Sequence, residues 1–386
     1  THAHRVGNMS GRCPHRRTPG SAMTLPHLFS SVCVLVAAGL LVAGCAAVRA
    51  GQSDRMISPQ RGEDGRFHNP PDKNARPTQS AWKIWSRFLL EAKTGAVPRD
   101  AIPVRRLDRA TLDALDPAAN HIVRLGHSSH LLKLRGRYWL IDPVFSERAS
   151  AVQWFGPRRF HAPPLSLDEL PPIEGLILSH DHYDHLDRAT IVHLSERVQR
   201  YFVPLGVGAR LQRMGVDPKR VEEFDWWQGA SHAGVQLTAT PAHHFSGRTP
   251  WDRNSTLWAS WLIQSGSERI FFSGDSGYFE GFKTIGERFG VIDIAMMENG
   301  AYDSDWPSAH MSPDETVRAF KDLGARQLYL VHNGTFDLAF HPWREPLDRV
   351  ADIAEQEGLL LVTPEMGEVL TLGRPRQNQR WWKDLR

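Results

Sequence analysis

Hydrophobic positions in the middle of the chain form short apolar runs that polar turns separate. Such runs lie at residues 176–178, 201–205, 235–241, 270–274 and 328–331. Each has the length of a buried β-strand, and stretches with the helical spacing of apolar residues lie between several of them. Strands that alternate with helices, after hairpins at the start, predict an α/β fold of two packed sheets with helices outside.

A helix with an apolar face is predicted at residues 80–93, with Ser80 as its N-cap. The residues of this face are Trp82, Trp85, Phe88, Leu89 and Ala92. We expect the face to pack against the core of the protein. The alternative is a face that contacts lipid, because Trp favours membrane interfaces.

The N-terminal region has the pattern of a secretory leader. Residues 28–44 form an almost unbroken run of apolar and small residues. The run is short for a membrane-spanning helix and has the right length for the apolar part of a signal peptide. Arginines precede it if translation starts at Met9, whereas Met23, the other candidate start, leaves a weaker charged region. We assign residues 1–44 to the leader and exclude them from the fold.

The leader ends in L-V-A-G-C at residues 41–45, which resembles a bacterial lipobox. Cleavage before Cys45 would leave lipid on its sulfur, and an uncleaved N-terminal anchor is the alternative. Ala46 follows, and not an aspartate that retains lipoproteins in the inner membrane. We therefore expect a lipid-anchored protein of the bacterial cell envelope, in the outer membrane and facing the periplasm, with a flexible tether at residues 45–74.

Composition and charge narrow the function of the remaining chain. Hydrophobic residues make up 41% and Trp occurs thirteen times, which allows a large core. The net charge of +3 falls to −1 without the four arginines of the leader, so nucleic-acid binding has no support. The only cysteines are Cys13, Cys33 and Cys45. The mature domain therefore has no cysteine for a disulfide or a metal site.

The richest stretch for chemistry is G-L-I-L-S-H-D-H-Y-D-H-L-D at residues 175–187. It begins as an apolar strand and then carries four side chains that can bind metal: His180, His182, Asp184 and His185. In extended chain, residues two apart point the same way, so His180 and His182 can share one ion. Imidazole and carboxylate together suit zinc and similar ions.

The pattern H-x-H-x-D-H after a short apolar strand resembles the metallo-β-lactamase superfamily. Longer stretches are similar to its branch that contains N-acyl-phosphatidylethanolamine-hydrolysing phospholipase D and bacterial relatives: residues 179–187, T-P-A-H-H-F-S-G-R at 240–248, and G-D-S-G-Y at 274–278. The resemblance implies a four-layer αββα sandwich of two mixed sheets for residues 75–373, followed by a C-terminal tail at 374–386.

The resemblance also implies two zinc ions, although other divalent metal ions could occupy the same site. The implied ligands are His180, His182 and His244 for one ion, Asp184, His185 and His332 for the other, and Asp275 shared by both. The adjacent His243 competes with His244, and we predict that His244 is the ligand and His243 supports it or lies at the rim. Asp142 matches a residue that supports the metal loop from behind. His127 and His130 are expected to have structural or rim roles.

The implied activity is that of a binuclear-zinc phosphodiesterase of the phospholipase D type. A hydroxide that bridges the metals would cleave N-acyl-phosphatidylethanolamine-like lipids, with Asp184 and His310 as catalytic residues. Residues 145–160, with Arg148, Arg158 and Arg159, either line a pocket for an anionic head group or form a surface loop. Alternatives are a lactonase or esterase for a small, possibly phosphorylated substrate, and a non-enzymatic metal-binding envelope protein. The branch also suggests a homodimer.

Overall fold

The structure, a computed structural model, describes residues 60–70, 78–374 and 379–386. The expected leader, both candidate start methionines, Cys45 and most of the tether lie outside the described residues. A short sheet at the start pairs β1 (Gln60–Arg61) with β2 (Phe67–His68).

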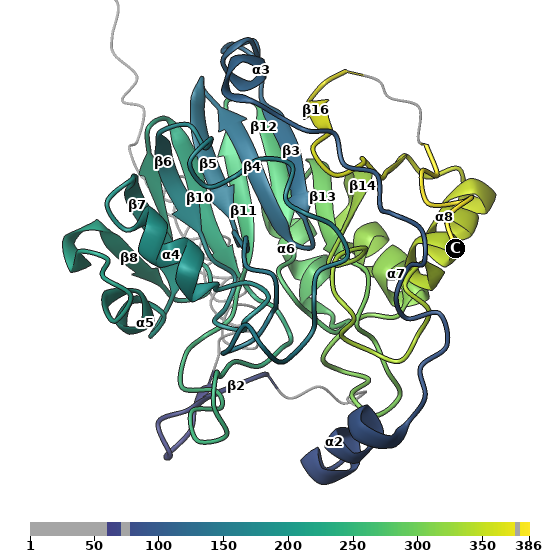
Figure 1. The fold of residues 1–386 in the computed structure, drawn as a ribbon. Helices are drawn as coiled ribbons and strands as arrows, with labels where there is room; N and C mark the ends of the chain where they lie inside the picture. The colour runs from purple at the N-terminus through teal and green to yellow at the C-terminus, as the bar shows by residue number, and fades with distance from the viewer. Residues whose placement is uncertain (1–59, 71–77, 375–378) are drawn as a thin grey trace, which may run out of the picture. The chain divides into compact units, whose positions relative to one another are not determined.

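Two seven-stranded β-sheets form the centre of the fold (Figure 1). The first sheet has the order β16-β3-β4-β5-β6-β7-β8, and its strands are β3 (His121–Gly126), β4 (Ser129–Leu134), β5 (Arg137–Ile141), β6 (Ile173–Ile177), β7 (Val198–Pro204), β8 (Val221–Phe224) and β16 (Val369–Thr371). The second has the order β15-β14-β13-β12-β11-β10-β9, and its strands are β9 (Gly229–His232), β10 (Val235–Thr240), β11 (Ser260–Ser265), β12 (Glu268–Phe272), β13 (Ile292–Glu298), β14 (Ala325–Val331) and β15 (Leu361–Val362).

Helices lie between and after these strands. They are α2 (Ala81–Leu90), α3 (Arg109–Asp113), α4 (Arg188–Leu194), α5 (Gly208–Gln212), α6 (Gly281–Phe289), α7 (Pro313–Leu323) and α8 (Glu345–Glu357), with a 3-10 turn at Pro218–Arg220. Helix α7 begins as its sequence predicts, with a capping box between Ser312 and Glu315 and with Pro313 in its first turn. In the described part of the chain, no helix is long and apolar enough to cross a membrane.

Alternating side chains of the strands divide the core into three layers. In β12, Ile270 and Phe272 pack between the two sheets, whereas Phe271 faces the opposite way. The outer side of the second sheet packs against α6, α7 and α8, and that of the first sheet packs against α3, α4 and α5. This arrangement confirms the predicted αββα sandwich of two mixed sheets.

Three elements differ from what their sequence indicates. Residues 189–200 have the pattern of one helix, but α4 ends at Leu194 and β7 begins at Val198. The apolar segment at 369–372 is predicted to close the second sheet, but β16 pairs with β3 of the first. Strand β13, between β12 and β14, is not predicted.

The last residues pack against the domain and do not form a free tail. Trp382 is fully buried, and its indole N–H donates to Asp348 Oδ1 at 2.9 Å. Arg380 forms ion pairs with Asp352 and Glu355 of α8. The buried ring of Trp382 and the ion pairs of Arg380 hold residues 379–386 against α8.

The strand directions bring many loops to one edge of the sandwich. Strands β5 to β8 run parallel in the first sheet, and β12 to β15 run parallel in the second. Strands β10 and β12 both pair antiparallel with β11, so they end at the same edge. The loops after β6, β10, β12 and β14 therefore leave the sheets at their carboxyl ends. Helix α2 lies beyond this edge (Figure 1).

Candidate metal centre

The structure brings together all seven side chains that the sequence predicts as metal ligands. They come from four loops at the carboxyl ends of strands: His180, His182, Asp184 and His185 after β6, His244 after β10, Asp275 after β12, and His332 after β14. All except His182 and Asp184 are buried. The topology of the two sheets thus explains how residues up to 152 positions apart share one site.

The first group of ligand atoms contains three imidazole nitrogens and one carboxylate oxygen. His180 Nε2 lies 2.9 Å from His182 Nδ1, and His244 Nε2 lies 3.3 Å from the same atom. Asp275 Oδ2 is 3.7 Å from the Nε2 atoms of both His180 and His244. The four atoms lie within 4.8 Å of one another, which is close enough for one ion to contact them all.

The second group shares Asp275 with the first. Asp275 Oδ2 lies 3.1 Å from His185 Nε2 and 3.1 Å from His332 Nε2. Asp184 Oδ2 lies 3.5 Å and 3.3 Å from the same two nitrogens. One carboxylate oxygen therefore faces four histidines, two from each group, as a residue between two ions would.

Four buried atoms of the site have no hydrogen-bond partner among the described residues: His127 Nδ1, His185 Nε2, Asp275 Oδ1 and His332 Nδ1. Buried polar atoms are nearly always satisfied by a partner, so each orphan atom needs an explanation. A cation between the groups would satisfy His185 Nε2 and Asp275 Oδ1. The donor set of imidazole and carboxylate, together with these orphan atoms, fits divalent metal ions.

Burial keeps the three histidines of the first group neutral. It lowers the pKa of His182, and it lowers the pKa of His180 and of His244 well below the usual value for histidine. Neutral imidazoles have a free lone pair, which is the form that binds a metal ion.

The second group is charged in the absence of metal. Burial alone would lower the pKa of His332, but Asp275 and Asp184 outweigh burial and raise it to about 10. The same two carboxylates raise the pKa of His185 well above its usual value. Protonated histidines thus balance the carboxylates in the metal-free protein, and a bound cation would take over that role.

Asp142 supports the metal loop, as the resemblance implies. Its carboxylate accepts hydrogen bonds from Ser179 N at 2.8 Å, from Ser179 Oγ at 2.5 Å and from His185 Nδ1 at 2.7 Å. The bond to Nδ1 turns the Nε2 atom of His185 toward Asp275. Asp142 therefore fixes both the orientation and the tautomer of this histidine.

The two adjacent histidines have different surroundings. His244 Nδ1 donates to the carbonyl of Ala309 at 2.8 Å, which leaves Nε2 facing His182. His243 Nδ1 bonds instead to the carbonyl of Ser308 at 2.9 Å, and its ring belongs to none of the ligand groups. The geometry agrees with the choice of His244 as the ligand. Asn69, which the sequence did not single out for the site, holds the backbone of His244 from both sides.

His127 lies closer to the centre than a rim residue. Its Nε2 is 3.0 Å from Asp184 Oδ2, and its ring lies 4.0 Å from that of His332. Burial lowers the pKa of His127 to about 3, so the ring is neutral and donates to Asp184. His127 forms a group with Asp184, His185 and His332 whose ligand atoms lie within 4.8 Å of one another, so it stands among the predicted ligands. Its structural or rim role stays a prediction. His130 is buried elsewhere, between the carbonyl of Ser128 and the hydroxyl of Tyr329.

His310 lies beside both ligand groups, with its ring 5.0 Å from that of His244 and 5.2 Å from that of His332. Its Nδ1 bonds to the carboxylate of Glu298, the last residue of β13. Sequence analysis missed Glu298. The signal available was an apolar run at 294–297 that is followed by a single acidic residue.

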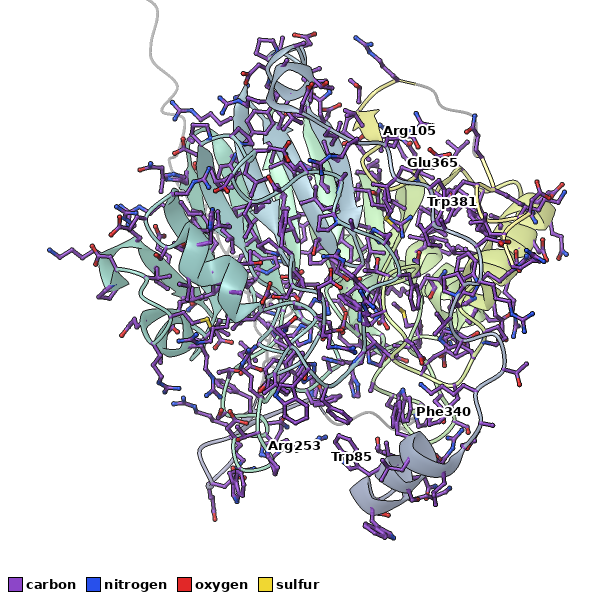
Figure 2. All side chains as sticks on the ribbon, in the orientation of Figure 1. Trp85, Arg105, Arg253, Phe340, Glu365 and Trp381 are labelled. Atoms are coloured by element: carbon purple, nitrogen blue, oxygen red, sulfur yellow. The ribbon has the colours of Figure 1, made fainter. Side chains whose placement is uncertain are left out.

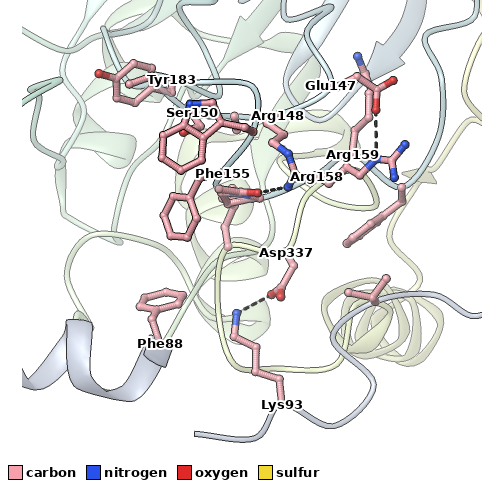
Figure 3. Close-up of a pocket in the computed structure, with 18 of the residues that line it drawn as sticks. Phe88, Lys93, Glu147, Arg148, Ser150, Phe155, Arg158, Arg159, Tyr183 and Asp337 are labelled. Atoms are coloured by element: carbon pink, nitrogen blue, oxygen red, sulfur yellow. Dashed lines mark hydrogen bonds and ion pairs between the residues drawn. The ribbon is translucent and has the colours of Figure 1, made fainter. Parts of the chain in front are cut away.

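A cleft of about 1470 Å³ lies beside this centre, lined by residues next to the ligands in sequence and not by the ligands themselves. Phe245, whose ring lies 4.6 Å from that of His182, is part of its wall. Figure 3 shows Phe88 and Lys93 on one side and the loop with Arg148 and Phe155 on the other. The predicted role of the 145–160 loop in lining a pocket therefore agrees with the structure.

The three arginines of this loop already have partners. Arg148 bonds to the carbonyl of Gly156, Arg159 bonds to the carbonyl of His161 at 2.8 Å, and Arg158 forms an ion pair with Glu147 at 3.1 Å. They shape the loop, and a role in binding an anion stays a prediction.

Helix α2 does not pack its aromatic face on the core, so this prediction was wrong. Trp82 is 82% exposed and Trp85 is 61% exposed. Ion pairs of Arg87 with Asp303 and Asp305, at 2.6 and 2.7 Å, hold the helix. Ile84 and Phe88 add contacts with a small apolar cluster around Trp306. Trp85 lies at the same edge of the domain as Arg253, and both line the cleft (Figure 2).

Comparison with known proteins relates the chain to metal-dependent hydrolases. A family model described as a beta-lactamase superfamily domain matches residues 137–333. An uncharacterized protein of Mycobacterium tuberculosis is 43% identical over 307 residues, with 78% of this chain and 80% of the relative covered. The N-acyl-phosphatidylethanolamine-hydrolyzing phospholipase D 1 of Caenorhabditis elegans is 34% identical over 263 residues, which cover 64% of this chain and 74% of the relative.

Solved structures support the fold. The metallo hydrolase Igni18 of Ignicoccus hospitalis superimposes with a TM-score of 0.52 at 18% identity, over 67% of this chain and 100% of that protein. At this identity the match concerns the fold alone.

Proposed function

Because the chain belongs to the metallo-β-lactamase superfamily and is a metal-dependent hydrolase of that fold, we propose that it is a binuclear-zinc phosphodiesterase. Its substrate would be a lipid of the N-acyl-phosphatidylethanolamine type, cleaved as by a phospholipase D. The observation that carries the proposal is the position of Asp275, whose Oδ2 atom faces histidines of both ligand groups.

The ligand groups fit two ions. His180, His182 and His244 would hold one ion, Asp184, His185 and His332 the other, and Asp275 both. When bound, such ions activate water at neutral pH and stabilise negative charge on a phosphoryl oxygen. Each group has three or four protein ligands, which leaves a position for water or substrate, as in catalytic zinc sites.

Residues of the chain itself would do the remaining work. Asp184 receives a hydrogen bond from His127 and would be held in place by it. His310 stands beside both groups and would orient the phosphate or protonate the leaving oxygen. The cleft walls, with Phe245 and Phe88, would exclude water from an acyl chain.

A lipid substrate is supported by the surface around the cleft. Trp85 on α2 and Trp154 and Phe155 on the 145–160 loop line the cleft and are exposed. Trp82 on α2 and Trp251, two residues before the cleft residue Arg253, are exposed as well. Large exposed apolar patches mark interaction sites, and Trp favours the interface of a membrane. Phospholipid in a membrane is therefore the proposed partner, and the homodimer expected from the resemblance stays a prediction.

The proposed location is the bacterial cell envelope. Its basis is the lipobox-like sequence at residues 41–45. We propose that Cys45 carries lipid and that the protein is anchored in the outer membrane, facing the periplasm. An enzyme tethered in this way would meet phospholipid at the membrane surface.

Turnover by the purified protein tests the proposal. We expect release of the N-acylated alcohol from N-acyl-phosphatidylethanolamine in mixed micelles, and a loss of about 100-fold or more in Asp184→Asn. Lys219→Gln is the control, because Lys219 is exposed and belongs neither to the ligand groups nor to the cleft wall. Cleavage of lactones or simple esters alone would favour the alternative of a lactonase or esterase. No turnover of either class with metal bound would favour a non-enzymatic metal-binding protein.

A further inference from the structure

Glu298 is a buried carboxylate beside the centre that the ligand sets do not use. It ends β13, and its side chain is inaccessible to solvent. One carboxylate oxygen accepts from His310 Nδ1, and the other accepts from the backbone N–H of Ser276 at 2.9 Å. Both oxygens are thus occupied by N–H donors, so Glu298 is not available as a further metal ligand.

The surroundings of Glu298 hold it in one position. Its backbone N–H donates to Ser273 Oγ at 2.9 Å, and its carbonyl accepts from Thr316 Oγ1 of α7 at 2.9 Å. A buried carboxylate is costly unless a positive or donating group compensates it. Burial and the nearby carboxylate of Asp275 raise the pKa of Glu298, whereas His310 and His332 act in the opposite direction. Of these two histidines, His310 is the one that donates directly to the carboxylate.

The contact with Glu298 fixes the orientation of the His310 ring. Because Nδ1 donates to the carboxylate, Nε2 is the ring nitrogen that remains for exchange of a proton with substrate. A ring nitrogen of His310 lies within 4.8 Å of the ligand atoms of Asp275 and His332. The free nitrogen therefore belongs to a ring that borders the reaction centre.

We propose that Glu298 is a positioning residue that holds His310 as the proton donor to the departing oxygen of the substrate. The inference rests on the proposed hydrolase function and deepens it. Water forms a new bond from its oxygen to phosphorus, and the bond from phosphorus to the alkyl oxygen breaks. For this step His310 carries a proton on each ring nitrogen, with the Nδ1 proton held by Glu298. The departing oxygen leaves with the electron pair of the broken bond and takes the Nε2 proton. The proton that the attacking water loses then returns to Nε2, so protons balance over one turnover.

The leaving group of the substrate distinguishes this role from a purely structural one. An alkyl oxygen needs a proton to leave, whereas p-nitrophenolate leaves without one. We would compare an alkyl phosphodiester with bis(p-nitrophenyl) phosphate, using wild type, Glu298→Gln, His310→Ala and the double variant. Glu365→Gln, which replaces an acid paired with Arg105 on another side of the domain (Figure 2), is the matched control.

We expect Glu298→Gln to lower kcat for the alkyl substrate about 100-fold and kcat for the aryl substrate less than about threefold. Bound metal should be unchanged. The double variant should be no slower than His310→Ala, because the two residues act as one unit. In the full-length protein, a downfield imidazole N–H proton resonance should disappear in both single variants.

Equal losses on both substrates, or additive losses in the double variant, would overturn the inference. If wild type cleaves only carboxylic esters, the phosphodiesterase proposal is refuted. The role of Glu298 would then be tested in the same way with an alkyl and an aryl carboxylic ester. A protein that cleaves neither class would overturn both proposals.

Discussion

At the scale of single residues, the adjacent histidines His243 and His244 provide a test of the ligand assignment. We expect His244→Ala to lose metal and at least about 100-fold in turnover, because its Nε2 faces His182. His243→Ala should keep its metal and lose less than about tenfold, because its ring bonds to the carbonyl of Ser308. Metal analysis and turnover of the two variants check this, and the reverse order of the losses would show that the assignment is wrong.

The sequence predicts the ligands well because they carry a strong local pattern. Four of them fall within six residues, and the others directly follow apolar strands. Glu298 has no such pattern, since a single acid at the end of an apolar run is common. Its role depends on a contact with His310, which lies twelve residues later in the sequence. Only folding brings the two side chains together.

At the scale of elements, α2 provides a test of the proposed membrane contact. We expect the double substitution Trp85→Ser and Leu89→Ser to slow turnover of lipid in vesicles about tenfold or more, because both side chains are exposed beside the cleft. Turnover of a soluble phosphodiester should change less than about twofold.

The control for α2 is Leu360→Ser, which removes an exposed apolar side chain that does not line the cleft. This variant should match wild type on both substrates. Equal slowing of the soluble and the vesicle substrate by the α2 substitutions would contradict a membrane contact.

The elements show where sequence patterns are insufficient. Apolar residues at helical spacing form one face of α2, and this spacing is the same whether the face is buried or exposed. The pattern alone therefore does not tell which of the two applies. Strand β16 is three residues long, and its pairing with β3 joins positions far apart in the chain. The two packed sheets with helices outside were predicted from the apolar runs and the helical stretches between them, and the four-layer sandwich from the resemblance. The order of the strands was not predicted.

At the scale of the whole molecule, buried neutral histidines should make stability sensitive to acid. Burial lowers the pKa of His130 and that of His161 to about 3. In the unfolded chain these groups take up protons below about pH 6.5, whereas the native state does not until about pH 3. Their contribution is therefore complete above pH 6.5 and is lost as the pH falls toward 3.

The size of this effect can be measured on the metal-free protein. At pH 5 each such histidine should cost about 2 kcal/mol of the free energy of unfolding relative to pH 7. Urea unfolding of wild type and His130→Gln at both pH values isolates one of them. The variant should lose about 2 kcal/mol less between pH 7 and pH 5, and an identical loss in both proteins would contradict the assignment of a neutral buried ring.

The central claim of the account is a two-ion centre built around Asp275, and bound metal per chain tests it most directly. We would purify wild type and Asp275→Ala in buffer with added zinc, remove free metal by dialysis, and measure metal by mass spectrometry. The account predicts about two ions per chain in wild type and a loss of metal in Asp275→Ala, since both groups share this carboxylate. Wild type without bound metal, or Asp275→Ala with the full amount, would contradict it.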